Sequence, residues 1–165
     1  MEQLNEWPPQ NWKALSVRQP WAELIISGRK TIELRSWTTN YRGPLWIHAG
    51  SRPPETTVRE IVDQPERLYR GGYVGWATVA LVVPMTLNRW GAWRNRHLDP
   101  GPFIGGLFGW LFIDVGRLSC PVPAHGHLKL YRPKPADLDR LRECQSHAPE
   151  PCQRGGGKLD CPEVL

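Results

Sequence analysis

Cationic, amide and aromatic side chains lie close together between residues 14 and 50 of this chain. Guanidinium and ammonium groups bind phosphate oxygens, amides and carboxylates hydrogen-bond to base edges, and aromatic rings stack on bases. Long planar donors interleaved with rings are therefore what a site for nucleobases and phosphates requires. The candidate nucleic-acid-binding residues are Arg18, Gln19, Trp21, Lys30, Glu33, Arg35, Trp37 and Arg42.

A short helix must position the first of these residues. Pro20 at its start and Gly28 just past its end are typical helix boundaries. Trp21, Leu24 and Ile25 recur at i, i+3 and i+4, which predicts one buried stripe on this helix.

A strand over residues 31–35 must position the next group. The hydrophobic period changes there from 3.6 to 2, and Ile32 and Leu34 point toward a core. The same pattern also fits a solvated surface ion cluster, which contributes little to stability. The polar face of this strand carries Thr31, Glu33 and Arg35, with Lys30 at its entrance.

Three motifs in this stretch carry a family resemblance. They are Ser16-x-Arg18-Gln19-Pro20-Trp21, Gly28-x-Lys30-x-x-Glu33-x-Arg35-Ser36-Trp37, and Tyr41-Arg42-Gly43. The chain resembles the ASCH domain (activating-signal-cointegrator homology) family of the PUA-like superfamily, and the likeness covers residues 13–133. The resemblance implies a small PUA-like β-barrel whose cleft is lined by these polar residues. It also implies RNA or single-stranded nucleic acid as the ligand, with a modified or flipped nucleotide as one form of it.

The sequence leaves catalysis open. Some small ASCH-like proteins are acetylcytidine amidohydrolases that use a lysine, a threonine three residues later and a distant glutamate. Lys30 matches the lysine, but the residue three positions later is Glu33, and no glutamate occurs between Tyr73 and Cys120. A ribonuclease needs a base, an acid and a cation around the reacting phosphate. If the protein is a hydrolase, the catalytic candidates are Lys30, Glu33 and Tyr41, whereas His48 is interpreted as a structural residue.

The charge of the chain fits a polyanionic partner. The chain of 165 residues has a formal net charge of +5. Between Lys13 and Gly50, basic residues 13, 18, 29, 30, 35 and 42 face only the acids 23 and 33. A basic face around the candidate site is typical of nucleic-acid binding, although the same charges also solvate a small barrel.

Tryptophan is abundant, with 9 in the chain. Trp46, Trp76 and Trp110 lie in strand-like runs and are interpreted as core residues. Trp21 and Trp37 flank the polar face and are the candidates for stacking on a base.

The sequence predicts an α+β fold, a PUA-like barrel of about six strands with short flanking helices. Residues 1–12 form an N-terminal extension, 13–145 the domain, and 146–165 a flexible C-terminal tail. A helix is expected over 51–72 and another over 137–144, and the expected later strands are 73–84, 109–115, 117–122 and 126–131.

The basic, Trp-containing insert 87–97 has three interpretations. It forms a second rim of the ligand groove, a surface helix with Trp90 and Trp93 packed beneath it, or the docking surface of a coactivator-type protein-interaction module. Packing is the favoured role of the two rings, and the role of the arginines stays open.

No metal, cofactor or membrane is expected as a partner. The N-terminus lacks the features of a signal peptide, and no apolar run approaches the ~20 residues that span a bilayer, so the expected location is cytoplasmic. A zinc site from Cys144, His147, Cys152 and Cys161 is conceivable, but its long spacings favour free thiols.

Overall fold

A computed structural model describes residues 8, 10–58 and 60–146 of the chain. The expected tail of 146–165 thus lies almost wholly outside the described residues. Strands and short helices alternate, which confirms the α+β class. In chain order they are β1 (Lys13–Val17), α1 (Trp21–Ile26), β2 (Ile32–Arg35), β3 (Gly43–Ala49), the 3-10 helix η1 (Pro65–Arg67), β4 (Gly72–Pro84), α2 (Leu87–Ala92), α3 (Arg94–His97), β5 (Phe108–Pro123), β6 (Leu130–Tyr131) and α4 (Pro135–Ser146).

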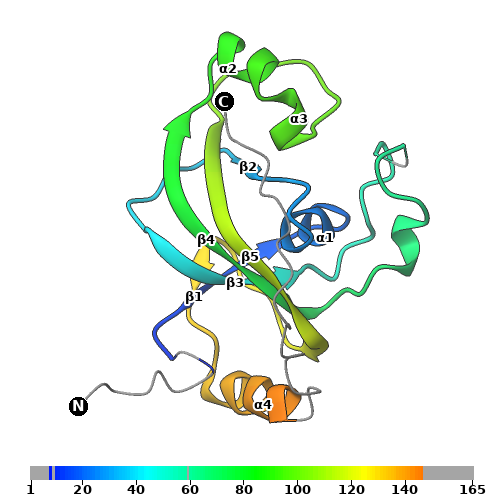
Figure 1. Ribbon diagram of the computed structural model, residues 1–165, viewed down its shortest axis with the longest axis vertical. Helices are drawn as coiled ribbons and strands as arrows, with labels where there is room; N and C mark the ends of the chain where they lie inside the picture. The colour runs from blue at the N-terminus through cyan, green and yellow to red at the C-terminus, as the bar shows by residue number, and fades with distance from the viewer. Residues whose placement is uncertain (1–7, 9, 59, 147–165) are drawn as a thin grey trace, which may run out of the picture.

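The strands form a 6-stranded sheet in the order β2-β5-β4-β3-β1-β6. Only β1 and β3 pair in parallel, and the other neighbours are antiparallel. The sheet curls into a half-barrel, with α2 and α3 at one end of the molecule and α4 at the other (Figure 1). The predicted small barrel of about six strands with short flanking helices is therefore confirmed, in the form of a half-barrel.

Alternation along β1 and β3 sorts their side chains between two cores. Leu15 and Ile47 pack with α1 in one buried cluster. Ala14 and Trp46 pack with α4 in the other. Since side chains of period 2 alternate between faces, the intervening residues of the same strands lie on the α4 side of the sheet. The polar residues Ser16 of β1 and His48 of β3 therefore lie on the α4 side of the sheet.

Close backbone packing shapes the long β4–β5 pair. The register of this pair shifts at three places, including the stretch of β5 from Ile113 to Gly116. A Cβ atom at Gly116 would lie 2.1 Å from the ring of Trp76, so only glycine allows this ring to rest on the neighbouring strand. The expected strands 109–115 and 117–122 are therefore one continuous strand, with an irregularity of register at the boundary that the sequence indicated.

The helix expected over 51–72 is absent from the part of this segment that the structure describes, apart from η1. The Arg18 guanidinium donates to the Pro53 and Pro54 carbonyls at 2.6 and 3.3 Å. It also pairs with the Glu55 carboxylate at 3.1 Å. These contacts hold the backbone in an irregular, non-helical path, and Pro65 restricts helix formation further on. The sequence signals within this segment predicted a helix, because they contain no information about contacts with a residue as distant as Arg18.

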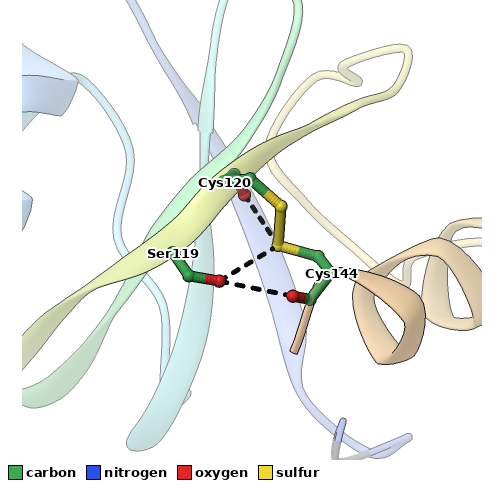
Figure 2. The surroundings of a disulfide bond; sticks show 3 residues. All are labelled: Ser119, Cys120 and Cys144. Carbon is green, nitrogen blue, oxygen red and sulfur yellow. Dashed lines mark hydrogen bonds between the residues drawn. A yellow bond between two sulfur atoms is a disulfide. The ribbon is translucent and has the colours of Figure 1, made fainter. Parts of the chain in front are cut away.

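The C-terminal helix α4 is longer than predicted and is linked to β5. A disulfide joins Cys120 to Cys144, with Cα atoms 6.1 Å apart, and the Ser119 hydroxyl lies 3.4 Å from the Cys144 carbonyl oxygen (Figure 2). Leu138 and Leu141 bury the same side of the helix against the sheet. The interpretation of Cys144 as a free thiol is therefore wrong, because α4 returns to β5 and brings the two cysteines together.

Replacing Cys144 with serine is expected to lower the free energy of unfolding by about 3 kcal/mol, because the bond closes a loop across a sequence separation of 24 residues. Urea unfolding of the Cys144→Ser variant without reductant measures the change. The wild-type protein in dithiothreitol is the matched control and should show the same midpoint as the variant. An oxidised wild type that unfolds together with both would contradict the prediction.

Within residues 8, 10–58 and 60–146, no helix is long and apolar enough to cross a bilayer. In the same residues, no three metal-ligating side chains gather. His147, Cys152 and Cys161, which completed the conceivable zinc site, lie outside the described residues.

Candidate functional site

A cavity of about 850 Å³ opens on the α4 side of the sheet. Its floor comes from β1 and β3, and its walls come from the loop after β3, the loop after β5 and the start of α4. It is the candidate functional site, and we call it the α4 cavity. Its lining residues are Ser16, Val17, Arg18, Arg35, His48, Gly50, Ser51, Arg52, Gly71, Pro123, Ala124, His125, Gly126, His127, Leu128, Lys134, Ala136, Asp137 and Arg140.

The α4 cavity is strongly basic. Among the described residues of its lining, Asp137 supplies the single carboxylate, and Arg140 pairs with it. Among the described residues, neither Arg52 nor Lys134 has a carboxylate partner. The cationic side chains of the lining are Arg18, Arg35, Arg52, Lys134 and Arg140.

Arg35 is held in place by a buried ionic network. Its Nη2 donates to the Ser16 carbonyl at 2.8 Å, and its Nε lies 3.2 Å from Glu33 Oε1. The other Glu33 oxygen lies 3.6 Å from Lys30 Nζ. The side chains of Glu33 and Lys30 are only 9% and 3% exposed, whereas that of Arg35 is 22% exposed. Glu33 therefore orients a guanidinium that reaches the cavity, and it is itself inaccessible to a ligand.

Lys30 lies behind this network, away from the α4 cavity. Its ammonium donates to the His97 carbonyl and lies 4.7 Å from the centre of the Trp21 ring. Burial lowers the pKa of Lys30 from its ordinary value, and the neighbouring Glu33 carboxylate opposes this shift. Lys30, Glu33, Trp21 and the His97 carbonyl thus form a largely buried cluster, which links the edge strand β2 to α1 and α3.

A hydrogen-bonded chain crosses the cavity floor. Ser16 and His48 are register partners on β1 and β3, and Ser16 Oγ lies 3.3 Å from His48 Nδ1. His48 Nε2 lies 2.9 Å from the Ala124 carbonyl, which can only accept, so Nε2 carries the proton and Nδ1 accepts from Ser16. Burial lowers the pKa of His48, which favours this neutral form.

The loop after β5 rests directly on that pair. A Cβ atom at Gly126 would lie 2.5 Å from Ser16 Oγ and 2.8 Å from His48 Nδ1. Only glycine permits the loop to approach this closely. Both ring nitrogens of His48 are bonded and the residue is only 1% exposed, so its contacts connect the cavity floor to the loop after β5. These contacts fit the interpretation of His48 as a structural residue.

Comparison with known proteins decides the family. The family model of the ASCH domain matches residues 15–99, more than half of the chain. The chain belongs to the ASCH domain family. Activating signal cointegrator 1 from Homo sapiens is 46% identical over 57 residues, and its Mus musculus counterpart is 50% identical over 58. Each match covers 34% of this ASCH protein but only 10% of the relative, so the chain spans about a tenth of their length.

Solved ASCH structures share the fold. The crystal structure of ASCH from Zymomonas mobilis superposes with a TM-score of 0.58 at 14% identity, covering 81% of this chain and 95% of that chain. A single-residue mutant of the Zymomonas protein gives a TM-score of 0.53 at the same identity, covering 81% and 96%. At this level of identity the likeness establishes the architecture of the ASCH domain alone.

The structure of this ASCH domain divides the candidate residues predicted from sequence. Arg18 and Arg35 line the α4 cavity. The others lie outside its lining. The lining combines residues between Ser16 and Gly71 with residues between Pro123 and Arg140. Those outside it are Gln19, Trp21, Lys30, Glu33, Trp37, Tyr41 and Arg42.

Several of the outlying candidates have structural partners. Gln19 is 1% exposed, and its side chain donates to the Tyr69 carbonyl at 2.8 Å. Trp37 packs edge-on against Trp110 with ring centres 4.7 Å apart. The Tyr41 hydroxyl donates to the Pro44 carbonyl at the start of β3. Stacking on a base at Trp21 or Trp37 would therefore take place away from the α4 cavity.

Sequence reasoning missed much of the cavity lining. Arg52, Lys134 and Arg140 supply cations, and His125 and His127 supply exposed rings. One signal was present in the chain, since residues 115–136 contain two histidines and several cations but no acid. Only the return of α4 to the sheet shows that this segment faces Arg18 and Arg35.

Proposed function

We propose that this ASCH domain binds RNA or single-stranded DNA and holds an unpaired nucleotide in the α4 cavity. The observation that carries the proposal is the cationic lining of the cavity, in which Arg35 is oriented by Glu33. A volume of about 850 Å³ lies within the range of small-molecule sites and leaves room for a nucleotide. The family resemblance supports RNA as the ligand class.

Each part of a nucleotide has a suitable partner in the α4 cavity. Arginine presents a planar fork that matches phosphate oxygens, so Arg35 and Arg52 suit the backbone of the strand. The exposed rings of His125 and His127 suit stacking on the base, a role that histidine takes in RNA-binding proteins. This assignment replaces Trp21 and Trp37 as the proposed stacking residues.

Hydrolase activity has less support than binding. The catalytic candidates Lys30, Glu33 and Tyr41 all lie outside the lining of the α4 cavity. Lys30 and Glu33 are also inaccessible behind Arg35. Incubating the purified protein with RNA and with acetylated nucleosides tests both hydrolase alternatives, and release of product would favour them over simple binding.

Replacing Arg35 with glutamine is expected to weaken binding of a short single-stranded oligonucleotide about 10- to 100-fold, because charge-assisted hydrogen bonds contribute about 1.5–3 kcal/mol. Fluorescence anisotropy with labelled single-stranded RNA, single-stranded DNA and duplex at two salt concentrations measures the affinity. Arg42→Gln is the matched control, since Arg42 is exposed, lies outside the cavity lining and donates to the nearby Thr39 and Tyr41 carbonyls.

Two outcomes would count against the proposed site. One is equal loss in the Arg35→Gln and Arg42→Gln variants, which would mean that net charge alone sets the affinity. The other is full affinity in Arg35→Gln. Because Arg35 contacts a buried carboxylate, Arg52→Gln serves as a second variant that removes an exposed cavity cation and should also weaken binding.

A further inference from the structure

A second basic surface lies on α2 and α3, at the end of the sheet opposite α4 (Figure 1). Residues 86–99 contain three arginines and one acid, Asp99. We call this the α2–α3 surface and define it by Arg89, Trp90, Trp93, Arg94 and Arg96.

The arginines of the α2–α3 surface have no carboxylate partner among the described residues. Arg89 Nη1 donates to the Pro84 carbonyl at 2.6 Å, and Arg94 Nη1 donates to the Asp99 carbonyl at 3.3 Å. Arg96 Nε donates to the Thr31 hydroxyl at 3.1 Å. Neutral acceptors orient a guanidinium without forming an ion pair with it, so the surface retains its attraction for an anion.

Indole rings lie beside these guanidinium groups. Trp93 has Arg89 at 5.6 Å and Arg96 at 5.8 Å from its ring centre, while Arg94 lies 6.0 Å from the Trp90 ring. Trp90 is only 3% exposed, so that ring is itself anchored in the fold. Stacking of this kind reduces the rotamer freedom that an arginine loses on binding. The two tryptophans thus support the cations and do not present free faces to bases.

The β4–β5 pair separates this surface from the α4 cavity. Pro84 of β4 pairs with Phe108 of β5 next to α2, whereas Pro123 at the other end of β5 lines the cavity. Arg35 extends the cavity toward α2, because it pairs with Phe108 on the other side of β5, so the full length of β5 is an upper limit to the separation. β5 has 16 residues, and a straight strand of this length spans roughly 50 Å, which is an upper limit because β5 is curved. A stacked strand with about 3.4 Å per nucleotide would need roughly 15 nucleotides to cover that span.

We propose that the α2–α3 surface is a second phosphate-binding site, which contacts the backbone of the bound nucleic acid outside the nucleotide held in the cavity. The identity of the polyanion rests on the proposed function, but the residues of this site are separate from the cavity. Three oriented arginines suit phosphodiester oxygens, which are spaced regularly and need no sequence-specific contacts.

The test compares a single-stranded 6-mer with a 30-mer. At about 3.4 Å per nucleotide the 6-mer covers roughly 20 Å, whereas the 30-mer can reach the α2–α3 surface from any part of the cavity. In the Arg89→Gln/Arg94→Gln variant, affinity for the 6-mer stays at the wild-type value and affinity for the 30-mer falls. The slope of log K against log salt for the 30-mer decreases in magnitude by about 1.4, since each lost phosphate contact on a single strand contributes about 0.7.

Two control variants separate contact from net charge. Arg67→Gln/Arg142→Gln removes two exposed arginines outside the α2–α3 surface and the α4 cavity and leaves the slope close to the wild-type value. Arg89→Lys/Arg94→Lys keeps both charges and retains most of the slope. Thermal unfolding of every variant identifies those that no longer fold.

A 30-mer slope that changes equally in the surface variant and the Arg67→Gln/Arg142→Gln control would overturn the second site. An unchanged slope in the surface variant would also overturn the second site, because it would mean that these arginines do not contact nucleic acid. A surface that binds an acidic protein would give this result. If the wild-type protein binds the 30-mer but not the 6-mer, and the surface variant loses this binding, the cavity proposal fails and the second site stands. Loss of 6-mer affinity in Arg35→Gln alone supports the cavity independently.

Discussion

The Glu33→Gln variant is expected to lose about 3–5 kcal/mol of unfolding free energy, because it leaves a buried charge without its partner. Lys30 is only 2% exposed, and its ammonium pairs with Glu33 at 3.6 Å. Removing the carboxylate also frees Arg35 from the contact that aims it into the α4 cavity. Stability and binding should therefore fall together in this variant.

Urea unfolding monitored by tryptophan fluorescence measures the loss. Glu23→Gln is the matched control, since Glu23 also pairs with an arginine but its partner Arg117 has a side chain that is 52% exposed. Exposed pairs contribute about 0–1 kcal/mol, so the control should lose little. The double variant Lys30→Met/Glu33→Gln should recover much of the stability, because it removes both buried charges. Equal losses at Glu33 and Glu23 would refute the network as described.

Acidification from pH 7 to pH 5 is expected to destabilise the protein steeply, through His48 and His97. Burial lowers the pKa of both histidines below the ordinary value of 6.5. The unfolded chain then binds more protons than the folded chain at pH values between the lowered pKa and 6.5. Stability therefore falls as pH falls through this window, by about 1.4 kcal/mol per pH unit for each histidine that stays neutral.

Hydrogen bonding supports the neutral forms of these rings. His97 Nε2 lies 3.0 Å from the Trp90 carbonyl, and His97 Nδ1 accepts from the Asp99 amide at 3.1 Å. Urea midpoints at pH 7, 6 and 5 give the slope, which should decrease in both His48→Gln and His97→Gln. His127→Gln removes an exposed ring and is the control. A slope of wild-type size in all three variants would show that other groups cause the acid sensitivity.

Local pattern predicted most of the fold. The change of period after Gly28 marked the boundary between α1 and β2, and the β-branched run 73–84 matched β4 closely. The failure at 51–72 has a tertiary cause, since Arg18 binds this segment through side-chain contacts 35 to 37 residues away. The disulfide was missed for a similar reason, because the pairing of Cys120 with Cys144 depends on where α4 docks.

The site was predicted only in part, because alternation along a strand identifies a face without showing what covers it. Glu33 and Arg35 share one face of β2, yet the Lys30 cluster buries the first and the α4 cavity exposes the second. The His97 carbonyl that covers Lys30 is contributed by α3, 67 residues later in the chain. No local pattern contains this information.

The α4 cavity also has a consequence for the order of synthesis. Arg18 and Arg35 are made early, but the opposite wall requires residues 123–140. The family model ends at residue 99, so a fragment that stops there would carry the signature motifs and lack the pocket. During translation the walls of the pocket are consequently complete only after residues 123–140 have left the ribosome, and the ligand proposed here could not bind there earlier.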